Sequence, residues 1–214
     1  YYSRYALEYP YPMGGYGGMF KAWSSKVARQ GIHEPYNSCG NGSAMRIAPV
    51  GWAFETEREV LEAAKVSASC THNHPEGIKG AQATALCIFL ARQGHTASDI
   101  RARIERDFGY DLSMSVEELQ RRYSWQGIDG KGDGGICQDS VPQAIICALQ
   151  AKDFEDAIRN AISIGGDSDT IGCIAGGIAE ALYGIPESIK ERAWKYLDET
   201  EGRTVRSFIQ KYSI

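Results

Sequence analysis

Residues 165–183 read GGDSDTIGCIAGGIAEALY, and this stretch decides the fold class. Its apolar side chains recur every three or four residues from Ile171 to Leu182, which is the period of a helix with one buried face. The three glycines within that pattern would weaken an isolated helix. They also let neighbouring helices approach closely, because glycine has no side chain. The stretch therefore predicts a helix packed among other helices.

Helical signals continue along most of the chain, and the alternation typical of strands is almost absent. The spacing of Thr56 with Glu59 and of Ser115 with Glu118 matches the capping box, which marks the start of a helix. Helices are expected over residues 19–28, 57–70, 79–92, 99–106 (capped by Ser98), 153–164, 170–183, 186–197 and 204–212, with a short one after Ser115 and one from Ser140 with Pro142 in its first turn.

Residues 127–135 contain five glycines and are expected to form a loop. These patterns predict an all-α fold, with residues 1–214 forming one compact domain.

Composition narrows the classes of function. A net charge of −4 gives no broad attraction to nucleic acid or to an anionic membrane. No apolar run approaches the roughly 20 residues of a membrane-spanning helix. None of the six cysteines forms a C-x-x-C pair, which argues against a zinc site. Reduced thiols are the simplest account, and we expect a cytoplasmic protein.

The start of the stretch at 165–183 carries the strongest chemical signal. Asp167 and Asp169 are separated by one residue, and the hydroxyl of Thr170 follows directly. Hard oxygen ligands at this density suit Mg²⁺ or Mn²⁺. The alternative is a plain helix cap, since Asp, Ser and Thr are preferred at helix starts. Two aspartates and a threonine exceed what a cap needs, but the residues alone leave both interpretations open.

Two further stretches are polar and rich in small residues. The first, SCGNGSAMR at 38–46, could present backbone N–H groups to phosphate or ribose oxygens, although an ordinary turn explains it more simply. The second, THNHPEG at 71–77, follows the end of an expected helix. Either His72 or His74 could face a pocket, or could cap the preceding helix.

Four segments become informative through their order along the chain. They are GNGSAMRIAPVGW at 40–52, THNHPEGIKGAQAT at 71–84, SVPQAI at 140–145, and FEDAIRNAISIGGDSDTIGCIAGGIAEALYG at 154–184. Together they resemble the ADP-ribosylglycohydrolase family, which includes the dinitrogenase reductase-activating glycohydrolase. That family is all-helical, in agreement with the helical patterns above.

The resemblance implies roles for individual residues. Asp167, Asp169 and Thr170 match the triplet that helps to hold a pair of Mg²⁺ or Mn²⁺ ions beside the ribose, and the two aspartates are the expected catalytic residues. The expected ADP-ribose pocket is formed by Ser38 near the diphosphate, Gly40, Asn41, Gly42, Met45, His72 and Gly166.

The resemblance also has departures. Family members carry an upstream Gly-Asp-rich helix, a Thr-Asp-Asp-Thr element with the other metal ligands, and an acidic catalytic residue, and none of these is found here. The chain could lack an N-terminal portion, which its start at Tyr1 favours, or a separate polypeptide could supply the missing ligands. Cys39 stands where an aromatic residue often occurs, which removes a stacking surface for the nucleotide.

Three functions remain open from the sequence. The leading expectation is a metal-dependent hydrolase that removes ADP-ribose from an ADP-ribosylated substrate by cleaving the glycosidic bond at the anomeric carbon of the ribose. A non-catalytic ADP-ribose-binding or structural relative is the alternative. A third is a helical interaction domain in which the GGDSDT segment is only a cap.

Overall fold

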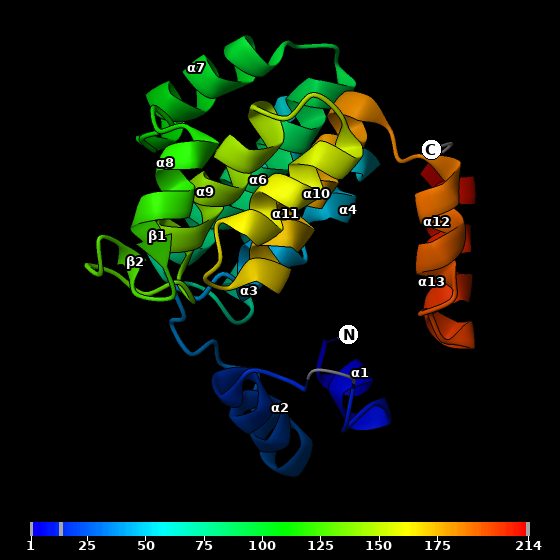
Figure 1. Cartoon of the computed structure of the whole chain (residues 1–214). Helices are drawn as coiled ribbons and strands as arrows, with labels where there is room; N and C mark the ends of the chain where they lie inside the picture. Colours follow the sequence, from blue (N-terminus) through cyan, green and yellow to red (C-terminus); the bar gives the residue numbers. More distant parts are fainter. Residues whose placement is uncertain (1, 13–14, 213–214) are drawn as a thin grey trace.

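The computed structural model describes residues 2–12 and 15–212, and helices account for most of them (Figure 1). The elements are α1 (Tyr2–Glu8), α2 (Gly18–Gln30), α3 (Gly42–Met45), α4 (Ala48–Ala53), α5 (Glu57–Ser69), α6 (Pro75–Arg92), α7 (Ala97–Phe108), α8 (Val116–Arg122), β1 (Tyr123–Ser124), β2 (Gly127–Ile128), α9 (Cys137–Leu149), α10 (Phe154–Ser163), α11 (Ser168–Tyr183), α12 (Glu187–Trp194) and α13 (Glu199–Tyr212). The all-α prediction is confirmed.

Local capping signals place several helix starts. The capping boxes at Thr56 and Ser115 are both present, as predicted. The predicted cap at Ser98 is wrong, because Thr96 caps α7 with Asp99 as the reciprocal partner. The third position after Thr96 is an aspartate that can reach back to the backbone N–H of Thr96, whereas the third position after Ser98 is Arg101.

Helix α9 begins at Cys137 rather than at the predicted Ser140, so Pro142 lies in its second turn. The reason is a contact distant in the sequence. The backbone N–H of Cys137 donates to the carbonyl of Cys39 at 2.9 Å, and that of Asn41 donates to the carbonyl of Gly135 at 3.0 Å. This short antiparallel pairing holds the chain extended up to Ile136, and the helix starts directly after it.

Helix α6 also begins earlier than predicted, at Pro75 rather than at Lys79. His74 is its N-cap, and the ring Nδ1 accepts a hydrogen bond from the backbone N–H of Glu76 at 3.1 Å. Pro75 at the first helical position has no N–H to leave unpaired. His74 therefore caps the helix that follows it, not the one before.

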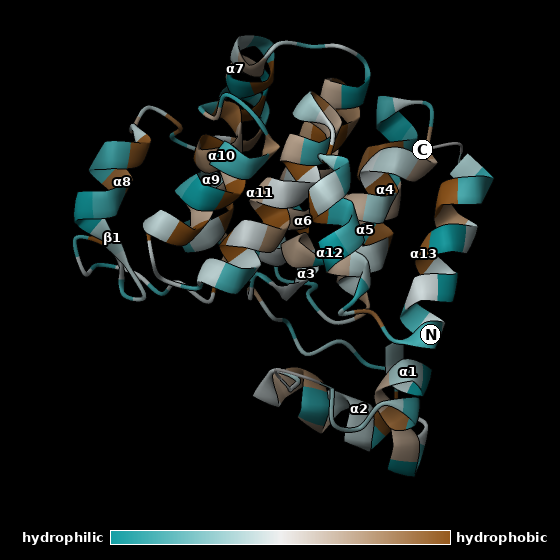
Figure 2. Cartoon of the chain, turned by 45° about the vertical axis from the view of Figure 1, so that its right-hand side comes forward, coloured by the Kyte–Doolittle hydropathy of each residue, from teal (hydrophilic) through white to brown (hydrophobic). Residues whose placement is uncertain are grey.

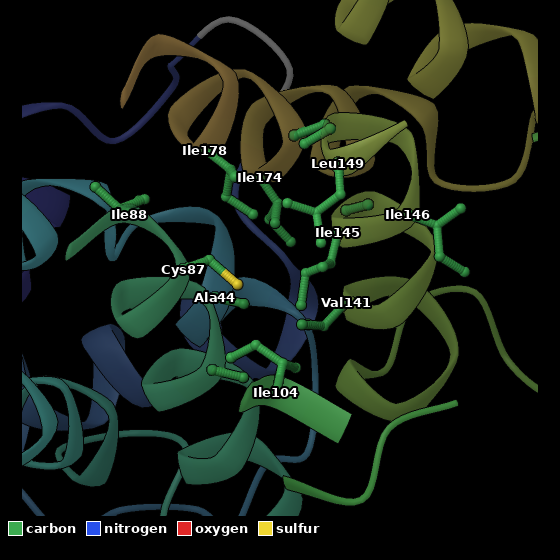
Figure 3. Close-up of a cluster of buried hydrophobic side chains, with 14 of the residues drawn as sticks. Ala44, Cys87, Ile88, Ile104, Val141, Ile145, Ile146, Leu149, Ile174 and Ile178 are labelled. Atoms are coloured by element: carbon green, nitrogen blue, oxygen red, sulfur yellow. The ribbon is translucent and has the colours of Figure 1, made fainter. Parts of the chain in front are cut away.

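The main core forms where α6 packs against α5, α9 and α11. Side chains from three of these helices meet there, among them Cys87, Ile145 and Ile178 (Figure 3). The apolar stripe predicted for α11 is buried at Ile171, Ile174 and Ile178, as expected. Its glycines permit the close packing, since a Cβ added at Gly177 would lie 3.1 Å from the Cβ of Ala48.

The helices near the two termini contribute little to this core. Both views place α1 and α2 below the central helices, and α13 lies at the side (Figures 1 and 2). Helix α12 has no buried residue and α13 buries only Gly202. Figure 2 shows hydrophilic residues along α8 and α12. The single-domain prediction stays a prediction.

In the described part of the chain, no helix has both the length and the apolar character that crossing a bilayer requires.

Candidate functional site

Asn41 joins three segments that are far apart in the sequence. Its side-chain Nδ2 donates to Asp167 Oδ2 at 2.6 Å and to the carbonyl of Gly134 at 3.2 Å. Asn41 is buried, so these bonds hold the loop at 38–46 against the start of α11 and against the glycine-rich loop before α9. The fold thus brings the small-residue loop and the acidic segment together, as the resemblance implies.

Asp167 occupies the N-cap position of α11 but does not act as a cap. Its side chain makes no capping hydrogen bond and accepts from Asn41 instead. The plain-cap interpretation of this aspartate is therefore wrong. Burial raises the pKa of the Asp167 carboxyl, the nearby Asp169 raises it further, and the bond from Asn41 acts in the opposite direction.

Asp169 lies on the exposed side of the same turn. Its Oδ1 accepts from the backbone N–H of Thr170 at 2.9 Å. Hydrogen bonding from the Asp167 carboxyl, and then from Thr170, lowers the pKa of the Asp169 carboxyl. The two carboxyls therefore influence each other, and their pKa values shift in opposite directions.

Thr170 and Met45 are in direct contact. The buried Thr170 hydroxyl donates to the Met45 sulfur at 3.8 Å, and the Cys173 thiol donates to the Met45 carbonyl at 3.1 Å. The hydroxyl gives only its proton to this contact, so the lone pairs of the Thr170 oxygen keep their capacity to bind another group. The structure thus places Met45 beside the acidic segment.

The donor set fits a hard cation only in part. Asp167, Asp169 and Thr170 offer the oxygen ligands that Mg²⁺ and Mn²⁺ prefer. Across residues 2–12 and 15–212, no group of three or more His, Cys, Asp or Glu side chains is placed to hold a metal ion. These three residues therefore do not make up a complete coordination shell among the described residues.

The loop at 38–46 uses two of its N–H groups in hydrogen bonds within the protein. The hydroxyl of the buried Ser38 accepts from the N–H of Gly40 at 3.0 Å, and the N–H of Asn41 is bonded to Gly135. These two N–H groups cannot also cradle a phosphate. The expectation of successive exposed N–H groups is wrong at these two positions, because the loop needs them to hold its shape.

Of the two candidate histidines, the fold brings only His72 to the loop. A Cβ added at Gly42 would lie 3.2 Å from His72 Nε2, and one at Gly40 would lie 3.6 Å from it. The Thr71 hydroxyl is 2.8 Å from the other ring nitrogen, Nδ1. Burial, with a smaller effect of Arg46, lowers the pKa of His72 to about 4, so its ring is neutral near pH 7.

This lowered pKa predicts a pH dependence of stability. The ordinary pKa of histidine in an unfolded chain is about 6.5, so the unfolded state takes up the proton first as the pH falls. The free energy of unfolding should therefore decrease between pH 6.5 and about 4, and change little above that window. Urea unfolding of the His72→Gln variant should show a smaller decrease over this range than the wild type. Replacement of the exposed His33 by Gln is the control and should leave the wild-type decrease; equal decreases in all three proteins would contradict the prediction.

Tyr123 belongs to the site, although no sequence signal indicated it. A Cβ added at Gly166 would lie 2.5 Å from Tyr123 Cε1, and Gly166 has a φ of +68°, so both space and backbone conformation demand glycine there. Burial, together with the nearby Asp167, raises the pKa of the Tyr123 hydroxyl. The expected loop at 127–135 begins as the second strand of the β1–β2 hairpin, and β1 supplies this tyrosine.

Comparisons with known proteins point to one family. The family model described as ADP-ribosylglycohydrolase matches residues 4–212. ADP-ribosylhydrolase ARH3 from Homo sapiens is 31% identical over 250 residues, covering 92% of this chain and 68% of that protein. ADP-ribosylarginine hydrolase Tri1 from Pseudomonas putida (strain GB-1) is 29% identical, covering 78% of this chain and 46% of that protein.

A solved structure described as an ADP-ribosylglycohydrolase-related protein complex matches all of this chain and 72% of its own, with a TM-score of 0.71 and 25% identity. The family model spans nearly the whole chain, and sequence and structural relatives agree with it. This chain therefore belongs to the ADP-ribosylglycohydrolase family.

Proposed function

We propose that this chain binds ADP-ribose and takes part in its hydrolytic removal from an ADP-ribosylated substrate. The bond that breaks is the glycosidic bond at the anomeric carbon of the ribose. The observation that carries the proposal is the hydrogen bond from Asn41 to Asp167, which joins the Gly-Asn-Gly loop to the acidic segment. This bond places the Gly-Asn-Gly loop on one side and the carboxylate oxygens of the acidic segment on the other.

Cleavage of the glycosidic bond requires negatively charged groups near the anomeric carbon. Positive charge develops at the anomeric carbon in the transition state, and the carboxylates of Asp167 and Asp169 would stabilise it. The same carboxylates and Thr170 would hold Mg²⁺ or Mn²⁺. Such an ion, when bound, orients the ribose hydroxyls. The proposed pocket residues are Ser38, Gly40, Asn41, Gly42, Met45, His72 and Gly166.

The neutral His72 would bond to the ligand as a neutral donor or acceptor and add no positive charge.

The remaining metal ligands would come from outside the described residues, either from an upstream segment or from a separate polypeptide. The partial donor set also favours a second candidate, a protein of the same fold that binds ADP-ribose without hydrolysing it. We further propose a cytoplasmic setting, in keeping with six cysteines that form no disulfide in the structure.

Calorimetric titration of ADP-ribose into the 214-residue chain, with and without Mg²⁺ or Mn²⁺, tests the proposal. Binding that strengthens with the cation is the expected result. Release of ADP-ribose from modified protein, assayed under the same conditions, then separates the hydrolase from the binding protein. Absence of binding in every condition would overturn both candidates for this chain.

A further inference from the structure

The phenol of Tyr123 lies between the two loops that Asn41 joins. A Cβ added at Gly166 would be 3.1 Å from Tyr123 Oη, and one added at Gly134 would be 3.3 Å from it. The hydroxyl therefore lies close to Gly166 and Gly134, on both sides of the Asn41 bridge. Pairing of Tyr123 with Ile128 across the β1–β2 hairpin fixes the backbone position from which the ring extends.

The same hydroxyl is buried and has no hydrogen-bond partner. Tyr123 is 6% exposed, and its Oη is among the buried side-chain atoms without a partner in the structure. Most buried polar groups in folded proteins are paired, and an unpaired one destabilises the free protein. A group left unpaired at a site is therefore one that a ligand can satisfy.

The surroundings of the hydroxyl define what it can bind. The nearby carboxyls of Asp167, Asp133 and Asp139 make the region acidic, and none of them accepts from Tyr123. A phenol at neutral pH keeps its proton and is a hydrogen-bond donor. A sugar hydroxyl suits this place, because its oxygen can accept from Tyr123 while its own proton is donated to a carboxylate.

We infer that Tyr123 is a positioning residue that donates a hydrogen bond to a hydroxyl oxygen of the ribose bound beside Asp167. This inference rests on the proposed function, because it takes ADP-ribose as the ligand. The phenol would orient the distal ribose, the one that ADP lacks. It would have no direct part in binding the adenosine diphosphate portion.

The Tyr123→Phe variant tests this inference with two ligands and a thermal measurement. Affinities for ADP-ribose and for ADP are measured by calorimetry, with ADP as a competitor where its direct signal is weak. We expect the variant to bind ADP-ribose about 5- to 10-fold more weakly and ADP as tightly as the wild type. The Tm of the ligand-free variant should equal or exceed that of the wild type, because the hydroxyl that is removed has no partner.

Tyr110→Phe is the matched control. Tyr110 is also 6% exposed and its hydroxyl is also unpaired, but its ring lies 4.5 Å from the ammonium of Lys79 and not against the Asn41 bridge. Its replacement should leave both affinities unchanged.

The other outcomes overturn the inference in distinguishable ways. Wild-type affinity of Tyr123→Phe for ADP-ribose would overturn it and leave the proposed function standing. An equal weakening for ADP-ribose and ADP would show that the phenol does not select the distal ribose. A Tm lowered by about 2–4 °C with unchanged affinity would show a structural partner for the hydroxyl. Failure of the wild type itself to bind ADP-ribose would overturn the proposed function, and this inference with it.

Discussion

Replacement of Asp169 by Ala should abolish cation-dependent binding and cleavage while leaving the fold intact. The Asp169 side chain is exposed, and its interactions with the backbone N–H of Thr170 and with the Asp167 carboxyl stay within the first turn of α11, so little structural stability depends on it. Loss of a residue that orients a metal ligand typically weakens metal binding by 10- to 100-fold, so loss of the proposed carboxylate ligand should cost at least about 100-fold.

The measurement is Mg²⁺ or Mn²⁺ titration of the wild type and the variant, followed by ADP-ribose release where the wild type releases it. Ser168→Ala is the matched control, because Ser168 lies between the two aspartates and is not a proposed ligand. It should retain wild-type cation affinity. Unchanged cation affinity in Asp169→Ala, with the fold intact by circular dichroism, would contradict the proposed metal site. Asp167→Ala is a poorer first test, since it also breaks the bond to Asn41.

Truncation of a core side chain on α11 should lower the stability of the fold strongly. Ile178→Ala should lower the free energy of unfolding by about 2–5 kcal/mol, because Ile178 is fully buried in the core and the packed helices around it relax only partly into the space left behind. Urea unfolding measures the change. The matched control is Ile162→Ala, in which the same side-chain atoms are removed from a residue that is 53% exposed. That control should cost about 0.5 kcal/mol.

Similar losses for the two variants would contradict the assignment of Ile178 to the core. The graded change Ile178→Val, which removes one methyl group, should cost about 0.5–1.5 kcal/mol. An additional consequence is expected at the site, because α11 carries both the buried stripe and the acidic segment. Loosening of this helix in Ile178→Ala should weaken cation binding more than Ile178→Val does.

Much of the fold could be predicted because its signals are local. Capping boxes at Thr56 and Ser115 act over three residues, and the stripe along α11 repeats within one helix. The correct start of α7 also had a local signal, the spacing of Thr96 with Asp99. The start of α9 had none, because it depends on pairing with Cys39 and Asn41, nearly 100 residues earlier.

The acidic segment, the Gly-Asn-Gly loop and the order of the family segments can be recognised in the sequence without the structure. Helix periodicity and capping determined the helical class, because both depend on neighbours within a few positions. The order of the family segments indicated the family. Only the tertiary structure decided that Asn41 bonds to Asp167, 126 residues away, and that His74 caps the helix that follows it. It also decided that Tyr123 lies against Gly166. Contacts of this kind depend on how whole helices pack, and side-chain packing between distant segments has no short-range pattern to read.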